Sequence, residues 1–213
     1  MYFFTKLFNY VLFASTKYNI DESHGIMHSM NVLHFAHEIY EAELPKNPQL
    51  HEQRRIIYTA AVLHDMCDKK YMDERDGITE IAKYIGADFY DYEVDAISSI
   101  IGTMSYSKVK KSGFPNLGTF QSAYHVVREA DLLAAYDFDR CMIYDLRKKD
   151  VDVLTAYQNA SDLFETRIFR HNADNLFVHD YSKKKSLELE SQAHLRIGTW
   201  RKIMCNTRST FNK

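Results

Sequence analysis

Apolar residues recur along this chain at the three- and four-residue spacing of helices over most of its length. The pattern predicts a first helix over residues 3–17, with one apolar side made of Phe4, Leu7, Phe8, Val11 and Leu12. Further helices are expected over 25–43, 50–65, 76–85, 90–102, 120–136, 138–149, 152–170 and 183–203. The segment 103–119 has the composition of a loop. The predicted fold is therefore all-α, an irregular bundle of about eight or nine helices.

Glycine and proline are scarce, with 7 and 3 in 213 residues. Sheet proteins need frequent turns, so this scarcity also favours helices. No internal repeat and no linker divides the chain. We therefore expect residues 1–213 to form a single domain, with its core over about 5–150 and C-terminal helices over about 151–213.

The composition narrows the classes of partner. Hydrophobic residues make up 46% of the chain, enough for a core of its own, so a bound metal would serve function rather than folding. The net charge is −2, without the basic excess of nucleic-acid-binding proteins, and we expect no nucleic-acid partner. The three cysteines are widely spaced, which is typical of free thiols in a reducing compartment and predicts a cytoplasmic protein.

The first thirteen residues are strongly apolar and allow two interpretations. A signal peptide would need a basic leader and a small-residue cleavage site, and neither is evident. The stretch is too short to span a membrane, and Lys6 and Asn9 interrupt it. We favour an amphipathic helix that packs on the domain, with no membrane partner. Its apolar side, over residues 2–13, leaves a homodimer open.

The dipeptide His64-Asp65 stands at the end of an apolar run, residues 60–63. It therefore lies where a buried helix reaches the surface. Adjacent helical side chains diverge by about 100°, but at a helix end both can reach one ion. The dipeptide alone is a weak signal, because it arises often by chance.

Two further groups strengthen this signal. His24 and His28 are four residues apart, which places them on one face of a helix. Asp131 has apolar neighbours, so we expect it to point inward, where a cation is the partner that it needs; pairing with Arg128 is the alternative. Mixed histidine and carboxylate ligands suit one divalent transition ion. We expect manganese, with Fe, Ni, Co, Zn or Mg as alternatives.

The order of these residues, His28, then His64-Asp65, then Asp131, resembles the HD-domain superfamily of metal-dependent phosphohydrolases. The patterns at 21–28 and 63–71 resemble its small single-domain bacterial branch, which includes nucleotide pyrophosphatases and phosphohydrolases. The resemblance covers about residues 5–150, and the rest of the chain matches no family pattern. It implies that the four residues hold the metal in the middle of the bundle, on three separate helices. It also implies that a metal-bound hydroxide releases phosphate or pyrophosphate from a small nucleotide substrate.

The resemblance also implies roles for residues beside the metal. His24 would contact the substrate phosphate or the attacking water, although a capping role is open to it. Asp68 would act as general base or orient the water, and Lys70 would bind phosphate, with Lys69 as its alternative. A solvated loop is the plainer interpretation of Asp68 and Lys70.

The chain departs from the family pattern at two places. Leu132 and Ala134 stand where the similar bacterial proteins carry Arg and Asp, so a charge pair near the site is missing. The segment 105–108 lacks their Gly-His element, and its Tyr106 and Lys108 are candidate contacts to a different substrate.

Two other functions stay open from the sequence. One is a phosphodiesterase of cyclic or signalling nucleotides, against which the short chain and the absence of a second metal motif speak. The other is a metal-binding sensor or interaction module with little turnover, which the altered residues Leu132 and Ala134 favour.

Overall fold

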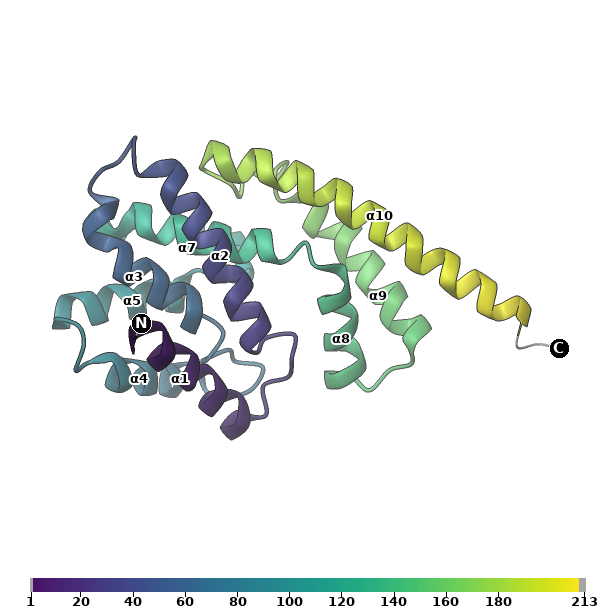
Figure 1. The fold of residues 1–213 in the computed structure, drawn as a ribbon, viewed down its shortest axis with the longest axis horizontal. Helices are drawn as coiled ribbons and strands as arrows, with labels where there is room; N and C mark the ends of the chain where they lie inside the picture. The colour runs from purple at the N-terminus through teal and green to yellow at the C-terminus, as the bar shows by residue number, and fades with distance from the viewer. Residues whose placement is uncertain (1, 211–213) are drawn as a thin grey trace. The chain divides into compact units, whose positions relative to one another are not determined.

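The protein is described here by a computed structural model that covers residues 2–210, with side chains to residue 205 (Figure 1). Over this range it forms ten α-helices and two short 3₁₀ helices, and no strand. The prediction of an all-α fold is confirmed. The α-helices are α1 (Tyr2–Tyr18), α2 (Ile26–Glu43), α3 (Leu50–Leu63), α4 (Glu74–Ile85), α5 (Asp91–Thr103), α6 (Tyr106–Ser112), α7 (Gln121–Ala134), α8 (Phe138–Lys148), α9 (Val153–Thr166) and α10 (Asp180–Thr210). The 3₁₀ helices span Gly118–Phe120 and Ile168–Arg170.

One helix more is present than the sequence predicted. The segment 103–119, expected as a loop, contains the short helix α6. Contacts of Lys108 help to hold this helix in place. Its ammonium group bonds both carboxylate oxygens of Glu74 and the Gly102 carbonyl oxygen, at 2.6 Å each. These contacts lie far apart in sequence, so the local composition did not indicate them.

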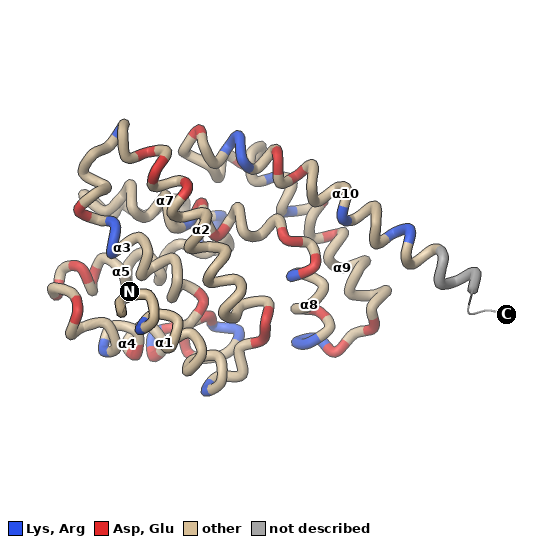
Figure 2. Tube along the Cα trace, in the orientation of Figure 1, with Lys and Arg blue, Asp and Glu red and all other residues tan. Residues whose placement is uncertain are grey.

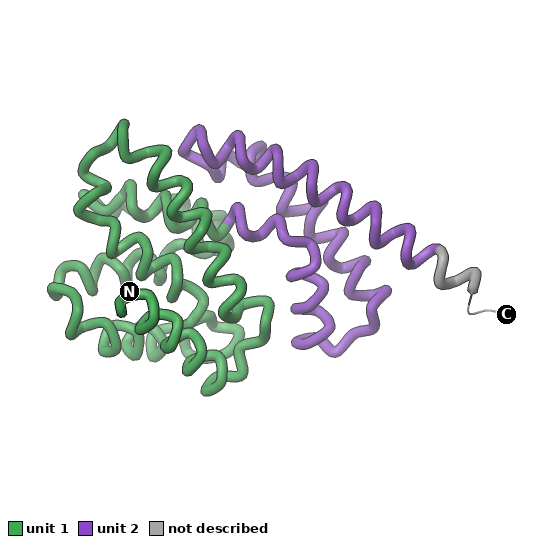
Figure 3. Tube along the Cα trace, viewed as in Figure 1, with its two compact units in different colours: residues 1–131 green, residues 132–213 purple. Residues whose placement is uncertain are grey.

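The chain divides into two compact units (Figure 3): unit 1 ends at Asp131 and unit 2 begins at Leu132. The division falls within α7 and not near residue 150, where the sequence analysis placed the end of the core. The expectation of one domain over 1–213 stays a prediction. Each unit has its own packed helices and is described separately below.

Helix α3 is the innermost helix of unit 1. It packs against α1, α2 and α5, and its second half is buried on every side, from Ile56 to Leu63 apart from the half-buried Tyr58. A helix that is apolar all round requires such burial. The end of α3, which is followed directly by His64-Asp65, therefore lies among other helices of the unit.

The first helix packs on unit 1 with a different face from the one expected. Its buried residues are Leu7, Tyr10, Val11 and Ala14. Phe4 and Leu12, predicted to point inward, are 37% and 50% exposed, so that part of the prediction was wrong. The apolar residues surround this helix too evenly for spacing alone to select the buried side.

Helix α4 approaches the segment after His64-Asp65 at a glycine. A Cβ atom added at Gly77 would lie 2.6 Å from Cβ and 2.9 Å from Cα of Cys67. Such distances are far below van der Waals contact, so no larger residue fits without displacing backbone. Asp73 begins the helix as its N-cap and accepts from the backbone N–H groups of Arg75 and Asp76.

Unit 2 contains α8, α9 and α10, which pack on one another. Phe138 of α8 and Phe164 of α9 meet edge to face, with ring centroids 5.3 Å apart. Asp139 of α8 accepts hydrogen bonds from Arg196 and from the indole of Trp200, both on α10. This polar contact fixes the long C-terminal helix against its neighbour.

The surface carries both signs of charge. Acidic and basic residues are scattered over both units (Figure 2), as the small net charge suggests. Among the described helices, none is both long enough and apolar enough to cross a membrane. The three cysteines are free thiols.

Candidate metal centre

Four side chains predicted as metal ligands meet in unit 1. The Nε2 atoms of His28 and His64 are 3.1 Å apart. An oxygen of Asp65 lies 3.2 Å from His28 Nε2 and 3.4 Å from His64 Nε2. An oxygen of Asp131 lies 3.4 and 3.6 Å from the same two nitrogens. We call these four residues the His-Asp cluster. They come from α2, the end of α3 and α7, so three separate elements converge there, as expected.

The end of α3 gives His64 its orientation. His64 follows the last residue of the helix, and its Nδ1 lies 2.9 Å from the carbonyl oxygen of Ala61. That carbonyl can only accept, so Nδ1 carries a proton, and Nε2 is the nitrogen that faces the cluster and can bind an ion once it is deprotonated. A second ring hydrogen bond of this kind is what metal-binding histidines usually have. The chain then turns, with Met66 N–H bonded to the Leu63 carbonyl, and Asp65 faces the same point.

The spacing of the donors fits one small divalent ion. Bonds of about 2.0–2.2 Å to nitrogen and oxygen place adjacent ligands of one ion about 2.9–3.5 Å apart. The measured separations run from 3.1 to 3.6 Å. The ligand atoms of His28, His64 and Asp65 also all lie within 4.8 Å of one another. Two imidazoles and two carboxylates suit a transition ion better than calcium.

The electrostatics of the cluster favour a cation. Burial alone would lower the pKa of His64 and raise the pKa of Asp65 and Asp131, because it disfavours the charged forms. The opposite charges outweigh burial: the pKa of His64 lies well above its ordinary value, and those of both aspartates lie well below. Both carboxylates are therefore ionised, as metal binding requires, and a bound ion would take the place of the proton that His64 holds on Nε2.

His24 lies beside the cluster but not on the helix that carries His28. Helix α2 begins at Ile26, after Gly25 as its N-cap, so His24 lies outside the helix. His24 stands in the preceding turn, with its ring centroid 6.3 Å from that of His28. The proximity was predicted correctly, whereas the reason for it, a shared helical face, was wrong.

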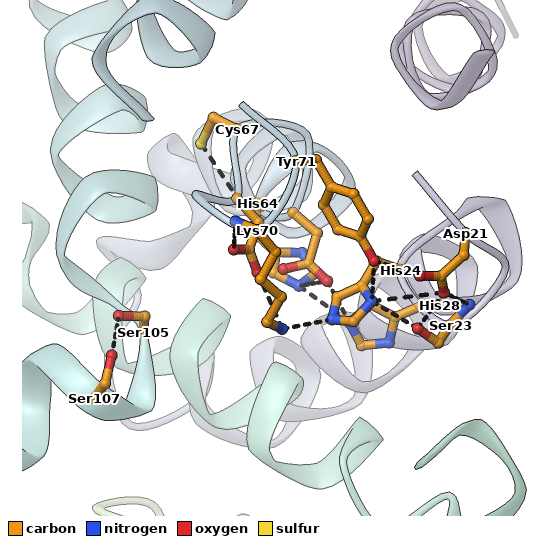
Figure 4. Close-up of polar contacts among 12 residues, drawn as sticks. Asp21, Ser23, His24, His28, His64, Cys67, Lys70, Tyr71, Ser105 and Ser107 are labelled. Atoms are coloured by element: carbon orange, nitrogen blue, oxygen red, sulfur yellow. Dashed lines mark hydrogen bonds and ion pairs between the residues drawn. The ribbon is translucent and has the colours of Figure 1, made fainter. Parts of the chain in front are cut away.

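A chain of polar contacts holds His24 (Figure 4). Its Nδ1 lies 2.6 Å from Ser23 Oγ and 3.1 Å from the Tyr71 hydroxyl, and its Nε2 lies 2.9 Å from Lys70 Nζ. Because an ammonium group can only donate, Nε2 accepts and Nδ1 carries the proton. The Tyr71 hydroxyl in turn donates to Asp21 at 2.6 Å.

The loop after the cluster carries the other predicted residues. Lys70 Nζ lies 3.3 Å from a carboxylate oxygen of Asp68, which also accepts from the backbone N–H of Lys70. The Lys70 side chain is 39% exposed, so its ammonium group sits between the network and solvent. Lys69 is exposed and bonds to none of the described residues, which leaves it outside the network.

The structure does not bring the segment 105–108 to the cluster. Figure 4 shows Ser105 and Ser107 bonded to each other and set apart from the histidines. Tyr106, between them, is half-buried at the start of α6. The Lys108 ammonium is directed at Glu74.

Sequence reasoning missed Tyr71 and the role of Asp21 as functional residues. The spacing Asp21-x-Ser23 is a signal for a turn in which the aspartate accepts from the backbone two residues on, and that bond is present at 2.9 Å. Burial alone would raise the pKa of Asp21, but the bonds from His24, Ser23 and Tyr71 hold it below its ordinary value. Tyr71 had no local signal, since its partners lie about 50 residues earlier.

The buried thiol of Cys67 takes no part in this arrangement. Burial, followed by nearby carboxylates such as Glu74, raises its pKa to about 12. A thiol that stays protonated is a poor nucleophile. Cys67 is therefore a packing residue.

Comparisons with known proteins bear on the fold alone. No protein-family model matches this chain, and no curated protein matches it. A crystal structure of a Lactobacillus plantarum protein, a structural-genomics target, is similar with a TM-score of 0.64. The match is 19% identical and covers 95% of this chain and 98% of that one. The chain thus shares its helical fold with this bacterial protein.

Proposed function

We propose that this protein is an HD-type, divalent-metal-dependent phosphohydrolase that acts on nucleotides. The observation that carries the proposal is the convergence of His28, His64, Asp65 and Asp131 at mutual distances that suit one ion. The residues come together from three elements, in the order typical of the HD superfamily. The free thiols also fit the cytoplasm.

The four residues of the His-Asp cluster would hold the ion. When bound, a divalent ion supplies positive charge beside a phosphoryl oxygen and lowers the pKa of water. Lys70 would bind the phosphate oxygens, and His24, whose Nε2 accepts a hydrogen bond from Lys70, would hold that ammonium group in place. Asp68, whose carboxylate lies 3.3 Å from Lys70 Nζ, would accept a proton from the attacking water. The favoured substrates are a nucleoside triphosphate and a nucleoside monophosphate.

The test is release of phosphate and pyrophosphate from a nucleotide panel with Mn²⁺, together with a measurement of bound metal. Asp65→Ala and Asp68→Ala form a matched pair on one loop. We expect Asp65→Ala to lose both metal and release. Asp68→Ala should keep the metal and lose about 10²–10⁴-fold in rate.

A second function is favoured by the apolar character of α7 near the cluster. Leu132 and Ala134 are 4% and 1% exposed, so no charge pair exists at these positions. A metal-binding sensor would bind Mn²⁺ and nucleotide without releasing phosphate. Bound metal with no release from any nucleotide would therefore replace the hydrolase proposal with the sensor, and absence of metal would contradict both.

A further inference from the structure

A hollow in unit 1, separate from the His-Asp cluster, is formed by faces of α1, α2 and α3. Its volume is about 810 Å³, and ten residues line it. This size lies within the range of pockets that bind small molecules, about 300–1,000 Å³. We call it the α1–α3 hollow. None of the residues of the cluster or of the His24 network lines it.

The walls of the α1–α3 hollow are mainly apolar. Phe4 and Phe8 are one helical turn apart on α1, and Met30 and Leu33 are three residues apart on α2. Phe4 and Met30 are 37% and 44% exposed. These side chains lie outside the core of the unit, so the apolar part of a ligand could be buried against them.

The polar groups at the hollow are cationic or neutral, and none of the ten lining residues is acidic. Arg55 is already engaged: its Nη2 donates to the Asp88 carbonyl at 3.0 Å, and its guanidinium lies 4.6 Å from the ring centre of Phe89. His37 lies 2.8 Å from the Tyr58 hydroxyl. Two carboxylates lie near the lining histidines: Glu38 is 3.6 Å from His34 Nε2, and Glu41 is 3.8 Å from His37 Nδ1.

Arg54 differs from these groups. It is exposed at the edge of the hollow, and no hydrogen bond or ion pair joins its guanidinium to the described residues. A planar guanidinium is the side chain best suited to hold a carboxylate through two parallel bonds. The edge of an apolar hollow thus carries one available site for one anionic group.

From this combination we infer that the α1–α3 hollow binds a monoanionic amphiphile, such as a medium-chain carboxylate. The chain or ring of the ligand lies against Phe4, Phe8 and Leu33, and its carboxylate pairs with Arg54. A nucleoside triphosphate is a poor fit, because its several phosphate charges would need more cations than Arg54 and Arg55, the two arginines among the lining residues, provide.

The test is calorimetric titration of the full chain with decanoate below its micelle concentration, with decanol and decyltrimethylammonium as chain-matched probes. We expect saturable binding of one decanoate, weaker binding of decanol, and none of the cation. Arg54→Gln should weaken decanoate roughly tenfold and leave decanol unchanged, since it removes only the charge-assisted bond. Arg75→Gln, an exposed arginine of α4 away from the hollow, is the matched control and should change neither.

Leu33→Trp fills the hollow and should abolish decanoate binding, with the fold checked by circular dichroism. Equal affinity for the three probes, or no effect of Arg54→Gln, would overturn the proposal. So would a stable dimer that Leu33→Trp dissociates, since the hollow would then be covered by a second copy. If the protein sedimented with phosphatidylglycerol vesicles and did not bind decanoate saturably, the proposal would also fail, and the hollow would be assigned to contact with a lipid surface.

Discussion

At the scale of single residues, Tyr71 and Tyr10 differ in the hydrogen bonding of their hydroxyl groups. The Tyr71 hydroxyl donates to the ionised Asp21 carboxylate at 2.6 Å. The Tyr10 hydroxyl is buried with no hydrogen-bond partner among the described residues. Removing a donor to a charged acceptor costs more than removing an unsatisfied group.

We therefore expect Tyr71→Phe to lower the free energy of unfolding by ~1–2 kcal/mol, because Asp21 loses a donor while it stays charged. Tyr10→Phe should change it by less than about 0.5 kcal/mol in either direction. Urea denaturation of both variants measures this. Equal losses in the two would show that the bond to Asp21 contributes no stability.

The candidate ligands could be predicted from the sequence because each carried a local signal. His64-Asp65 ends an apolar run, and Asp131 interrupts one. The residues that orient His24 had weaker local signals in the sequence. Asp21 was visible only as a turn residue, and Tyr71 became visible only when the chain folded back on the turn. Residue spacing predicts which side chains share one helix or turn, but it does not predict contacts between residues that are distant in the sequence.

At the scale of elements, Gly77 fixes how closely α4 approaches the loop after the His-Asp cluster. Alanine favours a helix over glycine by about 1 kcal/mol. At Gly77, however, the added methyl group would meet Cys67 backbone at 2.9 Å. We expect Gly77→Ala to destabilise the protein by ~1–3 kcal/mol, because the clash outweighs the helical preference.

The control for this substitution is Gly198→Ala in α10. A Cβ there would meet nothing within 4 Å, so only the helical preference acts, and stability should rise by ~0.5–1 kcal/mol. Thermal unfolding followed by circular dichroism compares the two. A gain from Gly77→Ala would mean that α4 can move away from Cys67 at little cost.

The contact between α8 and α10 should make unit 2 sensitive to acid. Burial would raise the pKa of Asp139, but the bonds from Arg196 and Trp200 outweigh it and lower that pKa. A lowered carboxylate pKa stabilises the fold above the unfolded value of about 3.9, and this stability is lost as the pH falls through the folded value.

Asp139→Asn should accordingly reduce the urea midpoint at pH 7, and the difference from wild type should shrink below about pH 4. Trp200 is the single tryptophan of the chain and contacts Asp139, so its fluorescence reports on this contact. Asp180→Asn, at an 86% exposed carboxylate of α10, is the control and should show little effect. A difference that persists at pH 2–3 would show that the ionised carboxylate is not the cause.

The buried face of a helix was predictable where its apolar residues form one stripe, and it was not predictable where apolar residues occur on several sides. The buried face of α2, with Val32, Phe35 and Ile39, follows its apolar spacing. In α1 aromatic residues occur on all sides, and the packing of α2 and α3 selected which became buried. Helix α6 depends on the Lys108–Glu74 contact, which no window of neighbouring residues contains.

At the scale of the whole molecule, the helical class followed from the scarcity of glycine and proline together with helical periodicity. The division at residue 131 did not, because it falls within the regular helix α7 and depends on where contacts gather. The four residues of the His-Asp cluster all belong to unit 1.

An ion that binds the folded cluster and not the unfolded chain should stabilise the protein by mass action. At a Mn²⁺ concentration of 100 times Kd, the gain is about 2.7 kcal/mol. Mg²⁺ should give less at equal concentration, since imidazole ligands favour transition ions. Hydrogen exchange should slow in α2, α3 and α7, which carry or adjoin the four ligands. Asp65→Ala should abolish the gain, and an equal gain in that variant would mean that Mn²⁺ acts at another site and that the cluster is not its binding site.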